Sequence, residues 1–189
     1  MKALDVIKLT SLYIGEKDLL STTTLGGATA PTASQTSTID TLLNCVNDVV
    51  ETLAIMYFPL KYEEEIISSS GVINLSSFTK TVCEIVSVKD EHGFEVDFTL
   101  YPTYIKTKIG RNNYQYCYIP SRVSSLNSNL EVCADKVSIR LVVLGVVSRY
   151  YLMQGMLGDA NAWQDVFNTT ALALQASKRN QVIKKRRWF

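Results

Sequence analysis

The stretch VSIRLVVLGVVSRYYLMQGML, residues 137–157, decides the fold class of this 189-residue chain. Its apolar residues cover nearly every side of a helix, and such a helix needs neighbours on several sides. Asp135 is a candidate cap for it, and Gly158 is a plausible residue just past its end. Asp159 then caps a second amphipathic helix. The pattern predicts a helical hairpin over 134–179.

The first helix of this hairpin carries more apolar surface than one core stripe needs. A core stripe is supplied by Val137, Leu141, Leu144 and Tyr151. Either the small sheet predicted below covers the remaining apolar surface, or a neighbouring copy of the chain does. We expect a surface for oligomerisation, made of Ile139, Val143, Val146, Tyr150 and Met153. The second helix has its own stripe, made of Trp163, Val166, Phe167, Thr170 and Leu174.

Residues 1–59 are predicted to form two helices joined by a mobile loop. The first spans 3–14 and has one apolar face, made of Val6, Leu9, Leu12 and Tyr13. The loop, 21–38, is rich in Thr, Ser, Gly and Ala and has no charge, which is typical of a flexible linker. Thr38 is the expected cap of the second helix, and Phe58-Pro59 is its expected end.

Residues 60–133 change to the alternating, β-branched and aromatic pattern of strands, so we expect a small antiparallel meander inserted between the helices. The expected turns are 90–93, which contains His92, and 110–113. Glu63-Glu64-Glu65 is interpreted as a solvated edge strand rather than a catalytic carboxylate pair. The predicted strands are 62–67, 82–89, 94–100, 104–109 and 114–119. The fold class is therefore α+β.

Charge is divided unevenly along the chain, although the net charge is only +1. Residues 178–187 hold six bases and no acid, which leaves 13 bases against 18 acids elsewhere, a net charge of about −5. Residues 180–189 are therefore predicted to be a tail that docks on something acidic. The tail ends in Lys184, Lys185, Arg186, Arg187, Trp188 and Phe189. These residues suit either nonspecific nucleic-acid binding or docking into a groove of a partner protein.

The chain lacks the residue patterns of the common enzyme classes. One histidine, predicted to be exposed in a turn, leaves little for nucleophilic catalysis. The four cysteines form no CxxC pair, and we expect buried thiols, no metal and no cofactor. Nucleotide-binding and metalloprotease motifs are missing. The apolar run 141–147 is too short to span a membrane, and no signal peptide is evident. We expect a protein that is not an enzyme. The cysteines are Cys45, Cys83, Cys117 and Cys133.

Three features of the sequence resemble the head-to-tail connector, or portal adaptor, proteins of tailed bacteriophages. A first helix ends in Tyr13-Ile14-Gly15, and after a spacer a long helix ends in Met56-Tyr57-Phe58. A sheet follows, opening at 71–75 and continuing through 82–88 and 93–96. The C-terminal segment is the closest match. It comprises 148–155, 160–163, Phe167, Ala171-Leu172 and 186–189.

The resemblance implies a structural virion protein, with residues 1–189 as one adaptor domain. Such adaptors form rings, commonly of twelve subunits, whose helical core surrounds the channel through which DNA passes. Lys184 to Phe189 would bind the portal protein, and other surfaces would meet tail or nozzle proteins, further copies of the chain and, transiently, the passing double-stranded DNA. The implied location is the virion neck, after assembly in the host cytoplasm. The long sheet insertion resembles the podovirus-like adaptors that carry a β-domain. The alternative function is nucleic-acid binding through the basic tail.

Overall fold

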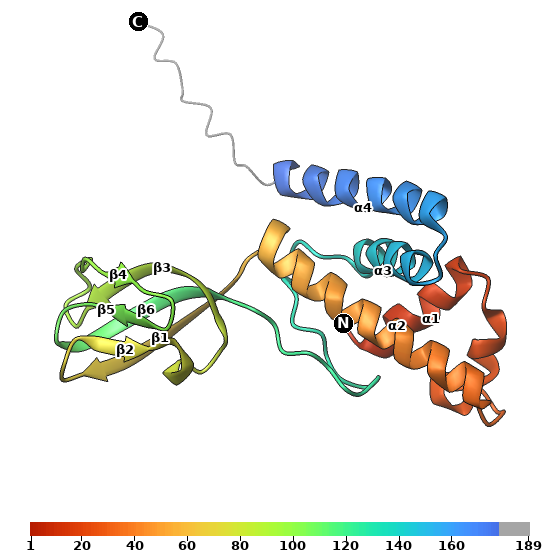
Figure 1. Ribbon diagram of the computed structural model, residues 1–189, viewed down its shortest axis with the longest axis horizontal. Coiled ribbons are helices and arrows are strands. Elements are labelled where there is room, and N and C mark those ends of the chain that lie inside the picture. The colour runs from red at the N-terminus through yellow and green to blue at the C-terminus, as the bar shows by residue number, and fades with distance from the viewer. Residues whose placement is uncertain (178–189) are drawn as a thin grey trace, which may run out of the picture.

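The computed structural model describes residues 1–177 and confirms the α+β class. These residues form four α-helices and two three-stranded antiparallel sheets. Figure 1 shows the helices gathered in one lobe and the strands in another, side by side along the long axis of the molecule. The helices are α1 (Ala3–Tyr13), α2 (Ala33–Thr52), α3 (Ile139–Met153) and α4 (Leu157–Ser177).

Helix α3 is the centre of the helical lobe. It contacts α1, α2 and α4, and every residue from Leu141 to Ser148 is buried. The expectation that the sheet or a neighbouring copy covers it is therefore wrong, because three helices of the same chain do so. Gly145 permits this close approach, since a Cβ there would lie 2.8 Å from Val49 Cγ1 and 2.9 Å from Phe167 Cε2.

The ends of the hairpin helices also differ from the prediction. Ser138, not Asp135, caps α3, with its hydroxyl accepting a hydrogen bond from the Leu141 amide at 3.3 Å. The chain turns at Gly155, whose φ of +75° suits glycine, so Gly158 and Asp159 already belong to the first turn of α4. The break between the two helices of the hairpin was therefore predicted about three residues too late along the chain.

Only part of the predicted stripe on α4 faces the core. Phe167 is buried together with Ala160 and Ala171, and Trp163 is half-buried, whereas Val166 is 48% exposed. The buried face is therefore built largely from small side chains around one phenyl ring. This composition follows from the close contact between α3 and α4.

The predicted helix over 3–14 is confirmed as α1, but its predicted face is partly wrong. Val6 is buried together with Ala3 and Ile7, while Leu12 and Tyr13 are 48% and 43% exposed. The buried face includes the polar residues Thr10 and Ser11, whose hydroxyls donate to carbonyl oxygens one turn earlier in the helix. Hydroxyls satisfied in this way can be buried at little cost.

Residues 21–38 are not an irregular linker. Two short 3₁₀ turns, 17–21 and 23–25, precede the helix, and Thr22 and Leu25 are buried. The next helix, α2, begins at Ala33 rather than after Thr38. Thr32 and Gln35 form a reciprocal capping box, with hydrogen bonds of 2.9 and 3.2 Å between side chain and backbone. The Thr, Ser, Gly and Ala content of 21–38 favoured a linker, although Thr32 and Gln35 have the spacing of a capping box at a helix start.

Replacement of Gly27 by alanine tests whether this segment is packed. A Cβ at Gly27 would lie 2.1 Å from the Ser21 carbonyl carbon, so the backbone must shift. We expect a loss of about 1–3 kcal/mol in the free energy of unfolding, measured by urea denaturation. Gly158→Ala is the control, because nothing lies within 4 Å of its Cβ position. Equal stability of the two variants would mean that the segment is not packed as described.

Helix α2 ends where the sequence predicts. It continues into a single π-helical turn, η3 (Leu53–Tyr57), and the Phe58 amide donates to the Leu53 carbonyl at 2.7 Å. Phe58 is buried and Pro59 follows it, so the chain leaves the helical lobe at this point. Strand β1 begins at the next residue, Leu60.

The β lobe is two small sheets and not one meander. One sheet has the order β1-β6-β3 and the other β2-β5-β4. Residues 110–113 were predicted to be a turn but are the start of β6, whereas the predicted turn at 90–93 is confirmed. Of the predicted strand 94–100, only 99–100 is a strand. The strands are β1 (Leu60–Ser68), β2 (Val72–Asn74), β3 (Val82–Asp90), β4 (Thr99–Leu100), β5 (Tyr104–Lys106) and β6 (Gly110–Tyr118).

Each lobe has a hydrophobic core of its own. The core of the helical lobe is centred on α3, and the smaller core of the β lobe lies around Tyr114 and Tyr116. Phe78 makes edge-to-face contacts with both rings, at centroid distances of 5.5 and 5.1 Å. Strands β1 and β3 lead away from the helical lobe and β6 returns to it, so the end of β3 lies at the far end of the β lobe (Figure 1).

The chain returns from the β lobe as an extended strap, residues 119–137, that lies on the helical lobe. The Leu4 amide donates to the Leu126 carbonyl at 2.8 Å, and the Leu130 amide donates to the Met1 carbonyl at 2.9 Å. The strap therefore packs with the helices, although 60–133 was predicted to be the β insertion. Lys80 of the β lobe pairs with Glu131 of the strap at 2.7 Å.

Candidate interaction surfaces

The structure places the predicted oligomerisation residues mostly inside the subunit. Val143, Val146 and Tyr150 are 1%, 0% and 8% exposed, and Ile139 is half-buried. Because the neighbouring helices already cover them, these residues offer almost no surface to another copy. Met153 is the exception, at 60% exposed. The predicted portal-binding residues Lys184, Lys185, Arg186, Arg187, Trp188 and Phe189 lie outside the described residues.

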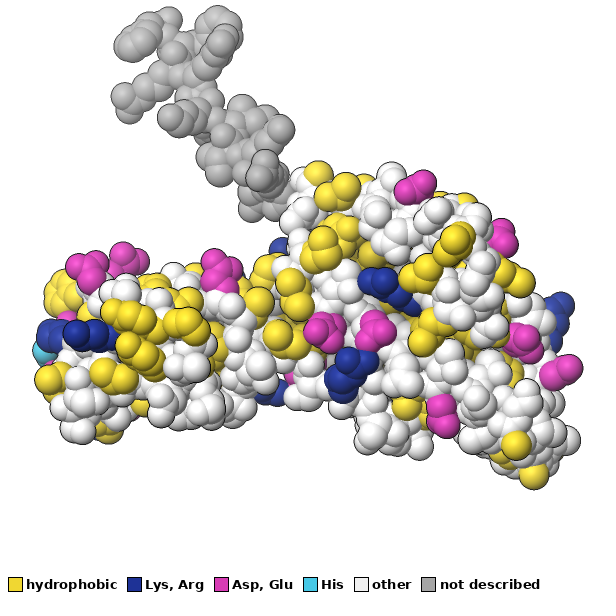
Figure 2. Space-filling view, in the orientation of Figure 1, with side chains coloured by type: hydrophobic (Ala, Val, Ile, Leu, Met, Phe, Trp, Pro, Cys, Tyr) yellow, Lys and Arg dark blue, Asp and Glu magenta, His cyan; other side chains and the backbone are white. Residues whose placement is uncertain are grey.

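The most exposed apolar side chains lie instead on both lobes. Within residues 1–177, the six most exposed large apolar side chains divide equally between the two lobes. Met56, Met153 and Leu157 belong to the helical lobe, at 60–66% exposure. Met153 and Leu157 lie with Leu152 and Met156 at the junction of α3 and α4, in a surface that we call the methionine corner. Figure 2 shows hydrophobic side chains gathered over both lobes. Ile67, Phe94 and Ile109, at 64–70%, belong to the β lobe.

The methionine corner is exposed because α3 ends there. Residues 152–157 span the last turn of α3, the tight turn at Gly155 and the first residue of α4. Four apolar side chains, Leu152, Met153, Met156 and Leu157, are therefore 47–61% exposed at this corner. Methionine is flexible and polarizable, which suits a surface that adapts to a protein partner. An apolar surface of this kind is typical of a protein interaction site.

A groove of about 360 Å³ lies beside the corner, between α2 with η3 and the α3–α4 hairpin. Met56 and Leu152 line it, together with Arg149 and the amide side chains of α4. The amides are held by a chain of hydrogen bonds. Ser148 donates to Gln164, Gln164 donates to Asn168 at 2.9 Å, and the Tyr57 hydroxyl donates to the same Asn168 oxygen at 2.9 Å. This chain fixes the shape of the groove wall.

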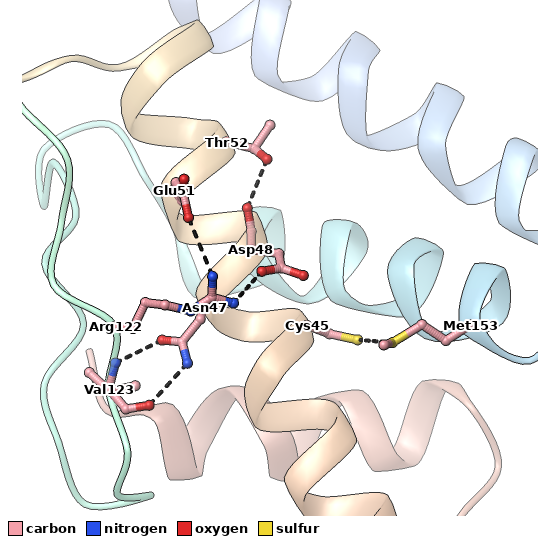
Figure 3. Close-up of polar contacts among 8 residues, drawn as sticks. All are labelled: Cys45, Asn47, Asp48, Glu51, Thr52, Arg122, Val123 and Met153. Atoms are coloured by element: carbon pink, nitrogen blue, oxygen red, sulfur yellow. Dashed lines mark hydrogen bonds and ion pairs between the residues drawn. The ribbon is translucent and has the colours of Figure 1, made fainter. Parts of the chain in front are cut away.

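Arg149 is the one cation that lines this groove among the described residues. It is half-buried and makes no ion pair within residues 1–177. Arg122 of the strap, in contrast, is neutralised by α2: it lies 2.5 Å from Asp48 and 3.7 Å from Glu51, as Figure 3 shows. A half-buried guanidinium without a carboxylate favours an anionic group from outside the subunit.

The apolar side chains of the β lobe lie at its far end, and we call Ile67, Phe94 and Ile109 the β tip. Phe94 follows a turn that Asp90 organises, since its carboxylate accepts hydrogen bonds from the His92 and Phe94 amides at 3.0 Å each. Desolvation acts to raise the pKa of Asp90, but these hydrogen bonds and nearby Lys108 outweigh it and lower that pKa. The turn therefore holds Phe94 outward in a defined position.

The acidic run in β1 is structural. Strand β1 is an edge strand, as predicted, because within residues 1–177 it pairs only with β6. Glu64 is not simply solvated: its carboxylate accepts hydrogen bonds from the Thr79 amide and hydroxyl, at 3.0 and 2.6 Å, and from Tyr116 at 2.6 Å. Desolvation opposes the charge, but these donors keep the pKa of Glu64 below its usual value. Through these hydrogen bonds Glu64 ties the 78–81 segment to the sheet.

The cysteines divide by environment, so the expectation of four buried thiols is wrong. Cys45 and Cys117 are buried, Cys133 is half-buried and Cys83 is exposed. Burial, followed by the charge of Asp48, raises the pKa of the Cys45 thiol to about 11. Because only the thiolate reacts readily, Cys45 is protected by both protonation and burial.

Thiol labelling at pH 8 is expected to separate these residues. Cys83 should react fast with a maleimide, and Cys45 should react only after urea unfolding, as read by peptide mass spectrometry. The Cys83→Ser variant is the control, since it should lose the fast phase and keep the urea-dependent one. Fast labelling of Cys45 in the folded protein would contradict the described position of α2 against α3.

His92 is exposed in the confirmed turn, with a side-chain exposure of 69%. Among residues 1–177, no three His, Cys, Asp or Glu side chains come together as a metal site. None of the described helices is long and apolar enough to cross a membrane. The described residues offer surfaces for protein contacts, namely the methionine corner with its groove, and the β tip.

Comparison with known proteins adds no family to this description. No protein-family model matches the chain, and no curated protein matches its sequence. The exposed surfaces of the two lobes are therefore the basis for a proposed function.

The signals for these surfaces were only partly visible in the sequence. Met153 was among the predicted contact residues, but Met56, Met156 and Leu157 were not. Two of the four methionines of the chain fall within the corner, three residues apart, and that clustering was the available signal. Phe94 directly follows the predicted turn, yet its exposure depends on the strands around it.

Proposed function

We propose that this protein is a ring-forming structural subunit, a head-to-tail adaptor that joins a phage portal to the tail and surrounds the DNA channel. The observation that carries the proposal is the presence of two separate apolar surfaces, one on each lobe of an elongated subunit. Two different surfaces that bind each other give a heterologous contact. Repetition of a heterologous contact closes a ring when the rotation between subunits permits.

The finer parts of this proposal follow the resemblance noted above. The four helices would be the helical bundle of the adaptor, and the β lobe would be its inserted sheet. Lys184 to Phe189 would bind the portal protein, with the aromatic pair as anchors and the bases as partners for acidic side chains. Tail or nozzle proteins would be the other neighbours, in a ring of about twelve subunits placed in the virion neck.

Self-association is the direct test. Light scattering and mass photometry should show a concentration-dependent oligomer, or an oligomer that forms when portal protein is added. Replacing Met153, Met156 and Leu157 by serine should weaken that oligomer. The matched control replaces Leu12 and Leu172, exposed apolar residues of the same lobe outside the corner, by serine. A strict monomer with and without portal protein would disprove the adaptor proposal.

Removal of Lys184 to Phe189 is expected to leave the thermal transition intact and to abolish attachment to the portal. Replacing Trp188 and Phe189 by alanine should account for most of the loss in binding free energy, on the order of 2 kcal/mol per aromatic anchor. Replacing the four bases by glutamine should mainly slow association and reduce its salt dependence. Undiminished attachment of the truncated chain would show that the anchor lies elsewhere, and loss of the thermal transition would make the tail part of the fold.

Nucleic-acid binding through the six bases of 178–187 is the alternative function. A salt-titrated DNA-binding assay separates it from portal docking, because affinity for phosphates falls steeply with salt. Steep, tail-dependent DNA affinity in a protein that stays monomeric would favour the alternative.

A further inference from the structure

We propose that the turn carrying Phe94 in one subunit inserts into the groove beside the methionine corner of the next subunit, with Glu95 pairing with Arg149. This inference rests on the proposed ring and names the contact that would build it. The occupant of the groove is therefore a second copy of the same chain. The contact is heterologous, as head-to-tail assembly requires.

The apolar side chains of the groove can cover an exposed apolar side chain of the β tip. Phe94 is the most exposed large apolar side chain of the described residues, at 70%, and it directly follows the turn after β3, at the far end of the β lobe. The groove offers about 360 Å³ between Met56 and Leu152. An aromatic ring beside methionine sulfur gains a contact beyond the burial of apolar area.

The two surfaces are also complementary in charge. Arg149 is a half-buried cation of the groove with no ion pair within residues 1–177. Glu95 is an exposed carboxylate, next to Phe94, and it too has no ion pair within those residues. Its neighbour Glu91 is already 3.6 Å from His92. An apolar anchor with an adjacent opposite charge is typical of the energetic centre of a protein interface.

Hydrogen bonds fix the turn and one wall of the groove before the two surfaces meet. The Asp90 carboxylate and the main-chain bond from the Asp90 amide to the Phe94 carbonyl, 2.9 Å, fix the turn. The hydrogen-bonded row of Ser148, Gln164, Asn168 and Tyr57 fixes one wall of the groove. Little conformational freedom is lost on docking when both surfaces are preorganised. Rigid, complementary surfaces suit a ring of fixed geometry.

Disulfide trapping tests the contact directly. In a Cys83→Ser background, chains carrying Phe94→Cys are mixed with chains carrying Leu152→Cys under mild oxidation. We expect a mixed disulfide that joins residue 94 of one chain to residue 152 of the other, identified by mass spectrometry. Phe94→Cys mixed with Leu172→Cys is the control, because Leu172 is exposed on α4 but does not line the groove. Equal trapping at both positions, or none, would overturn the proposal.

Charge reversal tests the ion pair. Arg149→Glu and Glu95→Arg should each weaken self-association on the order of 30-fold, and the double variant should regain most of it. Arg140→Glu, an exposed residue of α3 outside the groove, should change little. Phe94→Ser gives a further check, because its side chain is 70% exposed and folding should persist, as a thermal scan will show.

The outcomes of these experiments show whether this contact alone or the proposed function as well is wrong. If the wild-type chain assembles while trapping fails and Arg149→Glu assembles normally, the ring uses other surfaces and only this inference is overturned. If the wild-type chain stays monomeric with and without portal protein and no mixed disulfide forms, both are overturned. Selective trapping together with rescue by the double charge reversal would support the contact.

Discussion

Replacement of Phe167 by alanine is expected to lower the free energy of unfolding by about 3–5 kcal/mol, the largest effect expected for a single side chain here. Phe167 is 2% exposed and lies where α4 meets α3. Its ring makes an edge-to-face contact with Tyr57 at 5.9 Å and covers the position where Gly145 has no side chain. Because Gly145 offers no atoms to move into the space, the cavity cannot collapse from that side.

Urea denaturation of Phe167→Ala should therefore show a lower midpoint with an unchanged slope. Val166→Ala is the matched control, since it is the preceding residue of the same helix and is 48% exposed. The control should lose no more than about 0.5 kcal/mol. Similar losses for both variants would mean that α4 presents a different face to α3.

Replacement of Asn47 by alanine is expected to cost about 2–3 kcal/mol. Asn47 is 7% exposed on α2 and makes a double hydrogen bond with the backbone of Val123 in the strap. Its amide donates to the Val123 carbonyl at 3.0 Å, and its side-chain oxygen accepts from the Val123 amide at 2.8 Å (Figure 3). Alanine leaves both backbone groups without their partner, which is why the cost exceeds that of one lost hydrogen bond.

Hydrogen exchange shows whether Asn47→Ala loosens the strap alone or destabilises the whole fold. The Val123 amide should exchange faster in Asn47→Ala, ahead of amides in α3. Asn44→Ala is the control, because Asn44 is exposed on the same helix and its side chain makes no hydrogen bond within residues 1–177. Unchanged exchange at Val123 would show that the strap is held by its contacts with α1 instead.

Much of the helical lobe follows from local patterns in the sequence. The run 137–157 predicted a helix that needs neighbours on several sides, and α3 is buried from Leu141 to Ser148. Phe58-Pro59 ended a helix because proline restricts the residue before it. The turn at 90–93 followed from the Asp and Gly residues that close it. These features depend on a few neighbouring residues, so they can be predicted from the sequence.

The features decided by longer-range contacts were predicted less well. Residues 110–113 have the composition of a turn, yet they extend β6 because β1 and β3 pair with both of its edges. Residues 21–32 have the composition of a linker, yet Leu25 reaches the core of the helical lobe. In both cases the energy of pairing or burial with distant residues exceeds the local preference.

The sequence by itself determined that this chain is an α+β protein with an apolar central helix, an inserted set of strands and six basic residues between positions 178 and 187. Tertiary structure decided which apolar residues are available for contact. Val143, Val146 and Tyr150 were equal candidates with Met153 by composition, but α1, α2 and α4 cover the first three and leave Met153 exposed. Exposure depends on the packing of segments distant in sequence, and periodicity within one helix does not record which neighbours that helix has.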